Sequence, residues 1–408
     1  MVDQRGFDNQ PWVDADAAAT LLGVQRRTLY AYVSRGLVRS APGARGKARR
    51  YDRGDLERLV ARHKARAGHG PVAAGALRWG EPVLESSITA IGPRGPSYRG
   101  HVAVDLAERG TGLERTSELL WTGTLPEAAT WSRGALPWAA LAKMASDGAP
   151  GAALPLAVVA LGLRDPARHD ARPDAVLARA RAAIPVLAAA TSLRHADAAI
   201  DAATVAGVLA RALLGKSAGR DAIAALDVAL VLMADHELNA STFAARVVAS
   251  TGADLYACFA AALGALSGPR HGAMSARVEG LIDEVGTPRR AASVLRDRLA
   301  RGDELPGFGH PLYPDGDPRA APMLRLAQEI GGDLPRVRTA LAVAEAGVAV
   351  TGVHATCDVS LVALADALGL PRGAAAAMFA IGRTAGWVAH IIEQRAAGFL
   401  IRPRARQG

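Results

Sequence analysis

Cysteine and aromatic residues are scarce in this sequence. Among 408 residues there are two cysteines, Cys258 and Cys357, and only 4% of the chain is aromatic. Two cysteines cannot form the disulfide framework of a small secreted domain, and so few are typical of a reducing compartment. Strand-forming residues are also thin against a background of alanine and leucine, which are strong helix formers. We therefore predict an all-α protein.

Long apolar stretches are also missing. The longest run, from Gly151 to Leu163, ends at Arg164 and is too short to cross a bilayer. The first ten residues show no basic segment followed by an apolar one, so we expect no signal peptide. Together with the scarcity of cysteine, these features predict a soluble, cytoplasmic protein with no membrane partner.

Motifs for cofactors and metals are absent from the sequence. It contains neither a GxGxxG loop nor a Walker-type phosphate loop, and no histidine or cysteine cluster has the spacing of a metal site. His169 and His195 are isolated histidines near arginines, and we interpret both as non-functional. We therefore predict no metal site and no permanently bound cofactor.

Acidic residues are scarce in one region near the start of the chain. The formal net charge is +9, and Gln25–Arg66 alone contains thirteen Lys and Arg against three Asp and Glu. Such a local excess of positive charge repels itself and favours a polyanionic partner.

Two short helices with a tight turn between them are predicted in and just before this basic region. Asp14 is a cap for Ala15–Leu22, Gly23 provides the turn, and Gln25–Ser34 has apolar residues at helical spacing. A hairpin tip follows at 42–47, and Asp55–Arg66 is expected to form a third helix. The pattern resembles the MerR-type winged helix-turn-helix, a family whose members bind double-stranded DNA.

This resemblance implies two groups of DNA-contacting residues. Those at the start of the second helix, which would face the major groove, are Gln25, Arg26, Arg27 and Thr28. Those on the wing, which would lie near phosphates, are Arg45, Lys47 and Arg49. A competing interpretation is a small basic module that binds another protein or nothing.

The segment Leu305–Ala320, LPGFGHPLYPDGDPRA, is dense in glycine and proline. These residues interrupt helices and strands, so we expect an ordered loop with His310 at its apex. Asp317-Pro318 before an apolar run predicts a helix start, with Arg319 in the first turn. A titratable histidine near an arginine at a helix N-terminus favours an anionic ligand. The alternative is an ordinary surface turn.

The same loop resembles the GFGH-x-x-Y-x-x-x-DPRA segment of the citrate synthase family. Other segments of that family are present in the expected order. They are ESSITAIGPRGPSYRG, LLWTGTLPE, ADHELNAST around His236, LSGPRHGAMSARV around His271, TCDVS around Asp358, MFAIGRTAGWVAHIIEQ around Arg383, and GFLIRP, which contains Arg402. The resemblance extends from Leu77 to Arg402, which is most of the chain.

The resemblance implies a two-domain helical fold behind the winged helix-turn-helix. We predict the DNA-binding module over 1–68, a linker over 69–76, a large domain over 77–272 and 368–408, and a small domain over 273–367 that closes over the substrates. It also implies a homodimer, because Arg402 matches a position that reaches into the neighbouring subunit's site.

The implied reaction is a condensation of an acyl-CoA with oxaloacetate, followed by thioester hydrolysis. A thioester methyl group is a very weak carbon acid, and a carboxylate with a pKa of ~4 can deprotonate it only if a donor meets the developing enolate oxygen. The ketone acceptor needs a second donor, and its two carboxylates need cations. One Asp, two or three His and several Arg form the minimum set.

The family resemblance assigns this set to seven residues. The catalytic residues would be Asp358 as the base, His271 as the donor to the thioester oxygen, and His310 as the donor to the ketone oxygen. The residues that bind the acceptor would be His236, Arg319, Arg383 and Arg402. Acyl-CoA would be a co-substrate and free CoA a product.

Each of these residues also has an ordinary structural interpretation. His236 lies in a charged segment that would suit a surface, and His271 could begin a helix with no further task. Asp358 would suit a cap of the helix Val359–Leu368. Arg383 lies just before an apolar segment, where most arginines are only solvated. Their joint occurrence favours the functional interpretation.

The sequence departs from the family pattern beside the loop histidine. Two places that are basic in many relatives, one of them for CoA phosphates, hold Pro311 and Pro314. Thr356 stands where Asn is common, two residues before the base. Other basic residues that would suit the CoA phosphates, with nothing in the sequence to assign them, are Arg270, Arg289, Arg290 and Arg301.

Three functions are compatible with these patterns. The first is a citrate synthase or 2-methylcitrate synthase, two activities separated by one methylene that is worth only ~1–3 kcal/mol of discrimination. The second is a one-component transcription regulator whose body senses a carboxylate or an acyl-CoA. The third is a citryl-CoA lyase, which uses a similar site in reverse. The intact Asp358, His271 and His310 favour catalysis.

Overall fold

The computed structural model describes residues 12–34, 37–42, 49–56, 59, 84–145 and 148–403. The chain divides into two compact units, Met1–Glu85 and Ser86–Gly408. Each unit has its own hydrophobic core.

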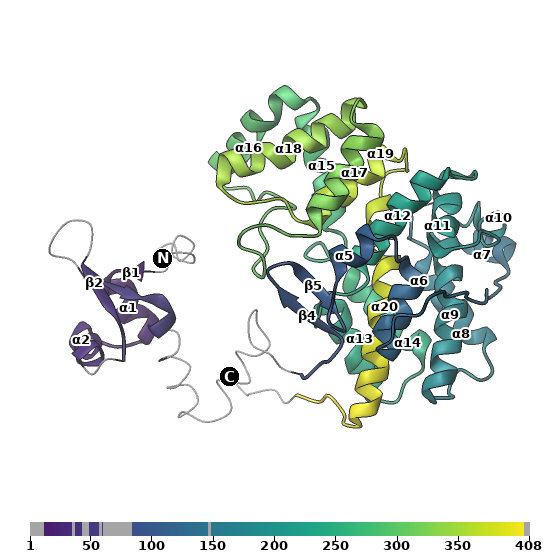
Figure 1. Cartoon of the computed structure of the whole chain (residues 1–408), viewed down its shortest axis with the longest axis horizontal. Helices are drawn as coiled ribbons and strands as arrows, with labels where there is room; N and C mark the ends of the chain where they lie inside the picture. The colour runs from purple at the N-terminus through teal and green to yellow at the C-terminus, as the bar shows by residue number, and fades with distance from the viewer. Residues whose placement is uncertain are drawn as a thin grey trace. The chain divides into compact units, whose positions relative to one another are not determined.

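The N-terminal unit combines a small sheet with short helices (Figure 1). Its elements are β1 (Trp12–Val13), α1 (Ala15–Leu22), α2 (Arg26–Ser34), β2 (Ser40–Pro42) and β3 (Arg49–Asp52). The strands form an antiparallel sheet in the order β1-β3-β2. Residues 53–56 and 59 are helical. The small core contains Val13, Ala18, Leu22, Leu29, Val38, Tyr51, Leu56 and Leu59.

The expected helix Ala15–Leu22 is confirmed, whereas the second helix begins at Arg26, one residue after the expected Gln25. The Asp14 carboxylate accepts hydrogen bonds from the N–H groups of Asp16 and Ala17, and so caps α1. Gly23 ends the helix in the left-handed conformation, with φ of 64°. The helix predicted at Asp55–Arg66 begins two residues earlier, at 53, and most of its remainder lies outside the described residues.

The larger unit is almost entirely helical. It begins with a small antiparallel sheet, β4 (Thr89–Gly92), β5 (Gly95–Tyr98) and β6 (His101–Val102). The helices that follow are α5 (Ala103–Glu108), α6 (Leu113–Thr122), α7 (Trp138–Met144), α8 (Leu154–Arg164), α9 (Pro173–Ala189), α10 (Ala196–Ala199), α11 (Val205–Leu214), α12 (Arg220–Met233), α13 (Ala240–Ser250) and α14 (Leu255–Leu266). The last group is α15 (Met274–Val285), η1 (Pro288–Arg290), α16 (Ala291–Ala300), α17 (Ala320–Gly331), α18 (Pro335–Thr351), α19 (Cys357–Ala367) and α20 (Ala374–Ala397).

Helix α20 forms the centre of this unit. It packs against α6, α9, α12, α13 and α14, and Figure 1 shows it in yellow among the teal helices. By length and composition α20 would be able to cross a membrane, but 89% of its apolar window is buried inside the protein. A buried window of this kind is typical of a core helix.

Helices α15 to α19 pack largely against one another and form the green lobe in Figure 1. They lie within the range predicted for the small domain, whose boundaries remain a prediction. Contacts between α19 and α20 and between α15 and α20 join this lobe to the central helix.

Candidate functional site

The glycine- and proline-rich loop is fastened to the start of α19. Gly307 has φ of 80°, and a Cβ there would lie 2.7 Å from methyl groups of both Val278 and Val359. The Gly307 carbonyl accepts hydrogen bonds from the Thr356 N–H at 2.8 Å and from its hydroxyl at 3.2 Å. Only glycine suits this conformation and this close approach. The attachment brings the His310 segment next to the helix that carries Asp358.

Three aromatic rings meet inside this loop region. The ring centroids of His236 and His310 lie 5.2 Å apart, and those of His310 and Tyr313 lie 4.9 Å apart. The Tyr313 hydroxyl is 2.8 Å from Nε2 of His236. His236 and Tyr313 are both buried. The prediction that His236 belongs to a site, rather than to a charged surface, is thus consistent with its position.

Both histidines in this cluster are neutral. Burial, with Arg319 and Arg383 nearby, holds the pKa of His236 well below its usual range. Burial, together with Arg319, lowers the pKa of His310 to about 4. The Nδ1 atom of His310 accepts a hydrogen bond from the Leu312 N–H at 3.2 Å. The single proton of this neutral ring therefore sits on Nε2, which makes that atom a donor.

Arg319 is a buried cation with a fixed partner. Its Nε and Nη2 donate to the two oxygens of Asp317 at 2.9 and 2.8 Å, and Asp317 also accepts from the Cys357 N–H at 3.0 Å. Burial opposes the charge on Arg319, but Asp317 keeps its pKa well above the ordinary value. Arg319 directly precedes α17, one residue before the first helical position and not in the first turn.

His271 lies in a second polar cluster. Its Nε2 is 2.8 Å from the Ser241 hydroxyl, which accepts a hydrogen bond from Nε1 of Trp387 at 3.1 Å and lies 2.8 Å from the Asn239 side-chain oxygen. The imidazole meets the ring of Phe379 edge-on at 5.7 Å. Burial, with Arg383 nearby, lowers the pKa of His271 to about 4, so this histidine is also neutral.

Asp358 is the second residue of α19 and is only partly exposed. Its Oδ2 accepts a hydrogen bond from the Thr356 hydroxyl at 3.1 Å. Burial raises its pKa to about 6, and the Thr356 hydroxyl opposes that shift. Thr356, not Asp358, is the helix cap, so the capping interpretation of Asp358 is wrong.

Arg383 supplies a second buried cation, from the middle of α20. Its Nε donates to the Met233 carbonyl at 2.8 Å, and its guanidinium lies 4.7 Å from the centroid of the Phe379 ring. Its Nη2 is buried and has no hydrogen-bond partner among the described residues. Burial lowers the pKa of Arg383. An orphaned buried donor costs free energy unless a ligand satisfies it.

The segment that carries His236 is fixed by a close approach of α20. The Gly386 N–H donates to the Ala234 carbonyl at 2.9 Å, which is outside the normal helical ladder. Asp235, fully buried, accepts from the Glu237 N–H at 3.2 Å and lies 3.3 Å from Nε2 of His390. The position of His236 thus depends on residues 150 positions further along the chain.

Other predicted residues are not brought to these clusters. Arg402 is exposed after α20, and among the described residues no hydrogen bond or ion pair joins it to the other candidates. The predicted CoA-phosphate candidates are also outside the histidine clusters. Arg301 pairs with Asp303 at 3.2 Å, Arg290 donates to the Val285 carbonyl, and Arg270 and Arg289 are exposed.

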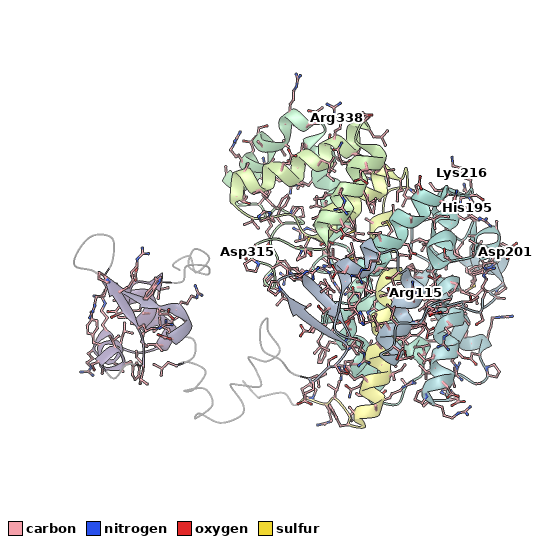
Figure 2. All side chains as sticks on the ribbon, viewed as in Figure 1. Arg115, His195, Asp201, Lys216, Asp315 and Arg338 are labelled. Carbon is pink, nitrogen blue, oxygen red and sulfur yellow. The ribbon has the colours of Figure 1, made fainter. Side chains whose placement is uncertain are left out.

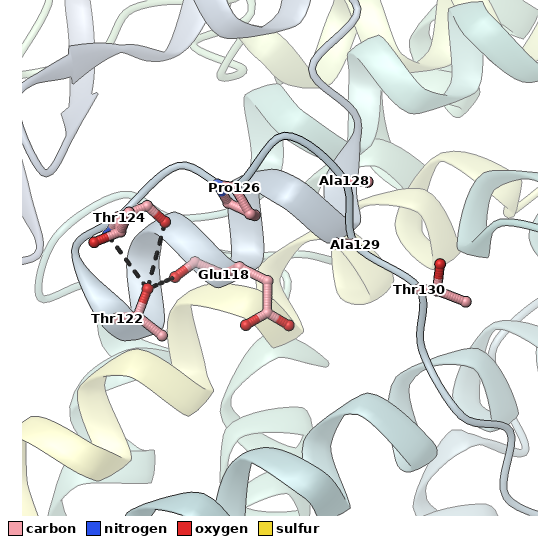
Figure 3. A pocket seen from close by; sticks show the side chains of 7 residues that line it. All are labelled: Glu118, Thr122, Thr124, Pro126, Ala128, Ala129 and Thr130. Atoms are coloured by element: carbon pink, nitrogen blue, oxygen red, sulfur yellow. Dashed lines mark hydrogen bonds between the residues drawn. The ribbon is translucent and has the colours of Figure 1, made fainter.

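A separate hollow lies at the end of α6. It has a volume of about 310 Å³ and is lined by Glu118, Thr122, Thr124, Pro126, Ala128, Ala129 and Thr130 (Figure 3). Glu118 already binds Arg181 through both oxygens and accepts from Nε1 of Trp131. None of the predicted residues lines this hollow. Nor does His195, which Figure 2 shows near α10 and which binds the Ala212 carbonyl at 2.9 Å.

In the N-terminal unit, the predicted DNA-contacting residues fall into three groups. Gln25, Arg27 and Arg49 are exposed, and Thr28 is half-buried. Arg26 is exposed but forms a two-pronged ion pair with Asp16 of α1, which competes with a phosphate contact. Arg45 and Lys47 lie outside the described residues.

Sequence reasoning missed two residues of the clusters. Tyr313 touches His236, His310 and Arg319, whose guanidinium lies 5.6 Å from the Tyr313 ring centroid. Ser241 joins His271 to Trp387. Both residues lie in the motifs that were recognised. The contact of Tyr313 with His236, and those of Ser241 with His271 and Trp387, each join residues at least 30 positions apart, so no local pattern identifies these roles.

Neutral imidazoles, a carboxyl group with a raised pKa and two buried guanidiniums define a helical protein with an acid–base site suited to a small anion. The citrate synthase C-terminal domain model matches residues 76–404, and a helix-turn-helix domain model matches residues 12–64. The chain belongs to the citrate synthase family.

Relatives and solved structures agree with that family. A Mycobacterium tuberculosis protein named "Putative citrate synthase 2" is 42% identical over 45% of this chain, and this match spans only half of that relative's length. The 2-methylcitrate synthase of the same species is 32% identical, covering 79% of this chain and 88% of the relative. Citrate synthase from Thermoplasma acidophilum, solved as a ternary complex with carboxymethyl coenzyme A and oxaloacetate, has a TM-score of 0.70 at 25% identity over 79% of this chain and 93% of that one.

Proposed function

We propose that this chain condenses an acyl-CoA with oxaloacetate and hydrolyses the resulting thioester. With acetyl-CoA the products are citrate and free CoA, and with propionyl-CoA they are 2-methylcitrate and free CoA. The observation that carries the proposal is the pair of clusters in which His271, His236 and His310 are neutral while burial raises the pKa of Asp358. The family's named members, and the ternary complex of one of them, support the same substrates.

Asp358 is the base in this mechanism. Its raised pKa of about 6 reduces the difference between its pKa and that of the weakly acidic thioester methyl group. The carboxylate is still ionised at neutral pH. The proton moves from the methyl carbon to the carboxylate, and the thioester oxygen becomes an enolate. An uncharged N–H donor suits that oxygen, because its hydrogen bond stabilises the negative charge that develops there.

His271 is that donor. Its Nε2 lies 2.8 Å from the Ser241 hydroxyl. That hydroxyl accepts from Nε1 of Trp387 and donates to Oδ1 of Asn239 at 2.8 Å, and this network holds the imidazole ring in place.

The acceptor binds between the cluster of His236, His310 and Tyr313 and the two buried arginines. Nε2 of His310 donates to the ketone oxygen as carbon–carbon bond formation turns it into an alkoxide. Arg319 and Arg383 bind the two carboxylates, and the orphaned Nη2 of Arg383 gains a partner. His236 contacts the acceptor's carbonyl or hydroxyl. Water then attacks the thioester carbonyl, and CoA leaves as the thiol.

We also propose a homodimer in which Arg402 completes the site of the partner subunit. Val159 and Leu163, four residues apart on α8, are 51% and 75% exposed, and α8 packs beside α14. An apolar stripe of this kind on a helix face favours a subunit contact. Phe399 and Leu400, just before Arg402, are 49% and 54% exposed and would be covered by the same partner.

A second function, binding of double-stranded DNA, is favoured by the helix-turn-helix match and by the exposed Arg27. In a cytoplasmic enzyme, DNA binding would link the presence of a carboxylate or an acyl-CoA to transcription. If the module binds duplex DNA, the logarithm of its affinity should fall with the logarithm of salt, with a slope of about −0.9 per phosphate contacted. Binding that does not depend on salt would contradict the proposal.

The experiment that tests the main proposal is release of free CoA, followed with a thiol reagent. Purified protein receives oxaloacetate with acetyl-CoA or, separately, with propionyl-CoA. Release with either one supports the enzyme, and the ratio of the two kcat/KM values identifies the donor. A chain that binds oxaloacetate but releases no CoA with either donor would instead be a carboxylate sensor coupled to DNA.

A further inference from the structure

The Tyr313 hydroxyl is the only hydrogen-bond partner that the described structure gives to the side chain of His236 from another residue. The 2.8 Å separation from Nε2 is that of a normal hydrogen bond, and Tyr313 is 5% exposed. If this hydrogen bond were lost, the buried phenol and the buried imidazole would each lack a hydrogen-bond partner, which costs free energy. This contact therefore determines how the His236 ring lies.

This hydrogen bond joins two uncharged groups. Burial raises the pKa of Tyr313 and lowers that of His236, so the phenol keeps its proton and the imidazole is neutral. Removal of the hydroxyl therefore leaves Nε2 of His236 without this partner.

Tyr313 also supports the other histidine of this cluster. Its N–H donates to the His310 carbonyl at 2.8 Å, so the two residues close one tight turn. Their rings lie 4.9 Å apart at an interplanar angle of 34°, and the Arg319 guanidinium lies over the phenol ring. One side chain thus touches His236, His310 and Arg319, each of which has an acceptor-binding or ketone-activating role in the proposed reaction.

We propose that Tyr313 is a positioning residue for the acceptor half of the site. Its hydroxyl fixes the orientation of the His236 ring, and its own ring keeps His310 directed at the same bound dicarboxylate. This inference rests on the proposed function, because it assigns the acceptor to these side chains. It predicts that the hydroxyl and the ring of Tyr313 have separable effects.

Two substitutions separate these effects. Tyr313→Phe keeps the ring beside His310 and removes only the hydroxyl. We expect oxaloacetate to bind about ten-fold more weakly, the size of one lost buried hydrogen bond, with KM raised by a similar factor and kcat within about three-fold. Tyr313→Leu also removes the ring beside His310, so kcat should fall as well, by about a hundred-fold, because His310 loses its alignment.

A matched control is Tyr256→Phe. The Tyr256 hydroxyl donates to Asp165 at 3.0 Å, and Tyr256 is 7% exposed on α14, with none of the candidate site residues as its partner. It also loses the hydrogen bond of a buried phenol, in this case a stronger one to a carboxylate, so its change in Tm sets an upper limit on the purely structural cost. Oxaloacetate binding by titration calorimetry, CoA release and Tm are measured on the full-length chain for the wild type and all three variants.

The outcomes are distinct. Weaker oxaloacetate binding in Tyr313→Phe, with a change in Tm no larger than that of Tyr256→Phe, would support the positioning role. Unchanged oxaloacetate binding in Tyr313→Phe, or losses that match the fraction of unfolded protein, would overturn it. If the wild type binds oxaloacetate but releases no CoA, the proposed reaction fails while the binding comparison still decides the role of Tyr313. A wild type that binds no oxaloacetate would overturn both.

Discussion

Burial shifts the pKa of the carboxyl group and the pKa values of the histidines of the site in opposite directions. It disfavours the charged form of each group, so it raises the pKa of Asp358 to about 6 and lowers those of His271 and His310 to about 4. At neutral pH the site therefore combines an ionised carboxylate with uncharged donors. The same desolvation that suits the chemistry also means that ionisation of Asp358 destabilises the folded state.

Asp358→Asn should therefore inactivate the chain and stabilise it. Loss of the base should reduce kcat at least ~10²-fold. The raised pKa of Asp358 means that ionisation destabilises the folded state above pH 6 and has no effect below its ordinary value of 3.8. The variant should gain at most about 3 kcal/mol at pH 8 and nothing near pH 3.5.

Chemical unfolding at these two pH values, together with CoA release, checks this prediction. Oxaloacetate binding serves as the control, because Asn keeps the shape of the side chain and the acceptor ligands are untouched. Equal unfolding free energies at pH 8, or lost oxaloacetate binding, would contradict the role assigned to Asp358.

The order of motifs in the sequence predicts candidate site residues but not their partners. The structure describes contacts for six of these candidates, which are His236, His271, His310, Asp358, Arg319 and Arg383. Asp317 was interpreted as the start of a helix, and its carboxylate in fact also forms the ion pair with Arg319. Tyr313 and Ser241 gain their meaning only from contacts between distant segments, which no single motif records.

At the scale of elements, glycines decide where the helices break and where they touch. The segment His101–Leu120 is rich in helix-forming residues, but it folds as β6, α5 and α6, with a turn at Gly110 and Gly112, whose φ angles are 63° and 81°. Helical composition was correct there, but two left-handed glycines interrupt the helix. Composition is averaged over a window, whereas a φ angle belongs to one residue.

Within α20, Gly386 has the opposite effect and allows a close contact. A Cβ at this position would lie 2.6 Å from the Ala234 carbonyl oxygen and would also collide with the Asp235 carboxylate. Gly386→Ala should therefore push the 234–239 segment away, destabilise the chain by roughly 2–4 kcal/mol and weaken oxaloacetate binding, because that segment carries His236.

Gly280→Ala provides the control for this substitution. Gly280 is an exposed residue inside α15, and a Cβ there meets nothing within 4 Å. Alanine should stabilise that helix by about 0.5–1 kcal/mol, and oxaloacetate binding should not change. If Gly386→Ala behaved like Gly280→Ala in thermal unfolding, the close approach of α20 would not be the constraint that positions His236.

At the scale of the whole chain, the two hydrophobic cores share no residue. Removal of residues 1–68 should therefore leave the Tm of the larger unit within about 2 °C and retain CoA release, because no core residue of that unit is lost. Calorimetry and the thiol assay on the truncated chain check this. Aggregation, or an inactive truncation with native circular dichroism, would show that the modules are not independent.

Stability of the larger unit should also depend on a buried carboxyl pair away from the histidines. Asp227 of α12 accepts from the Leu113 N–H at 2.9 Å, and Glu114 accepts from the Val205 N–H at 2.7 Å, so each satisfies the first turn of another helix. Burial, with Glu114 nearby, raises the pKa of Asp227 to about 7. Its ionisation thus destabilises the fold progressively between pH 3.8 and about 7.

Asp227→Asn should remove this pH dependence, since its side-chain oxygen can still accept from Leu113. We expect a gain of at most about 4 kcal/mol at pH 8 and none at pH 3.5. Asp221→Asn, an exposed change in the first turn of α12, should shift stability by less than about 1 kcal/mol at either pH.

The lowered pKa values of His271 and His310 act in the opposite direction, because they cost stability as pH falls from 6.5 to about 4. That acid-side loss should persist in Asp227→Asn, and its disappearance would show that the two effects are not independent.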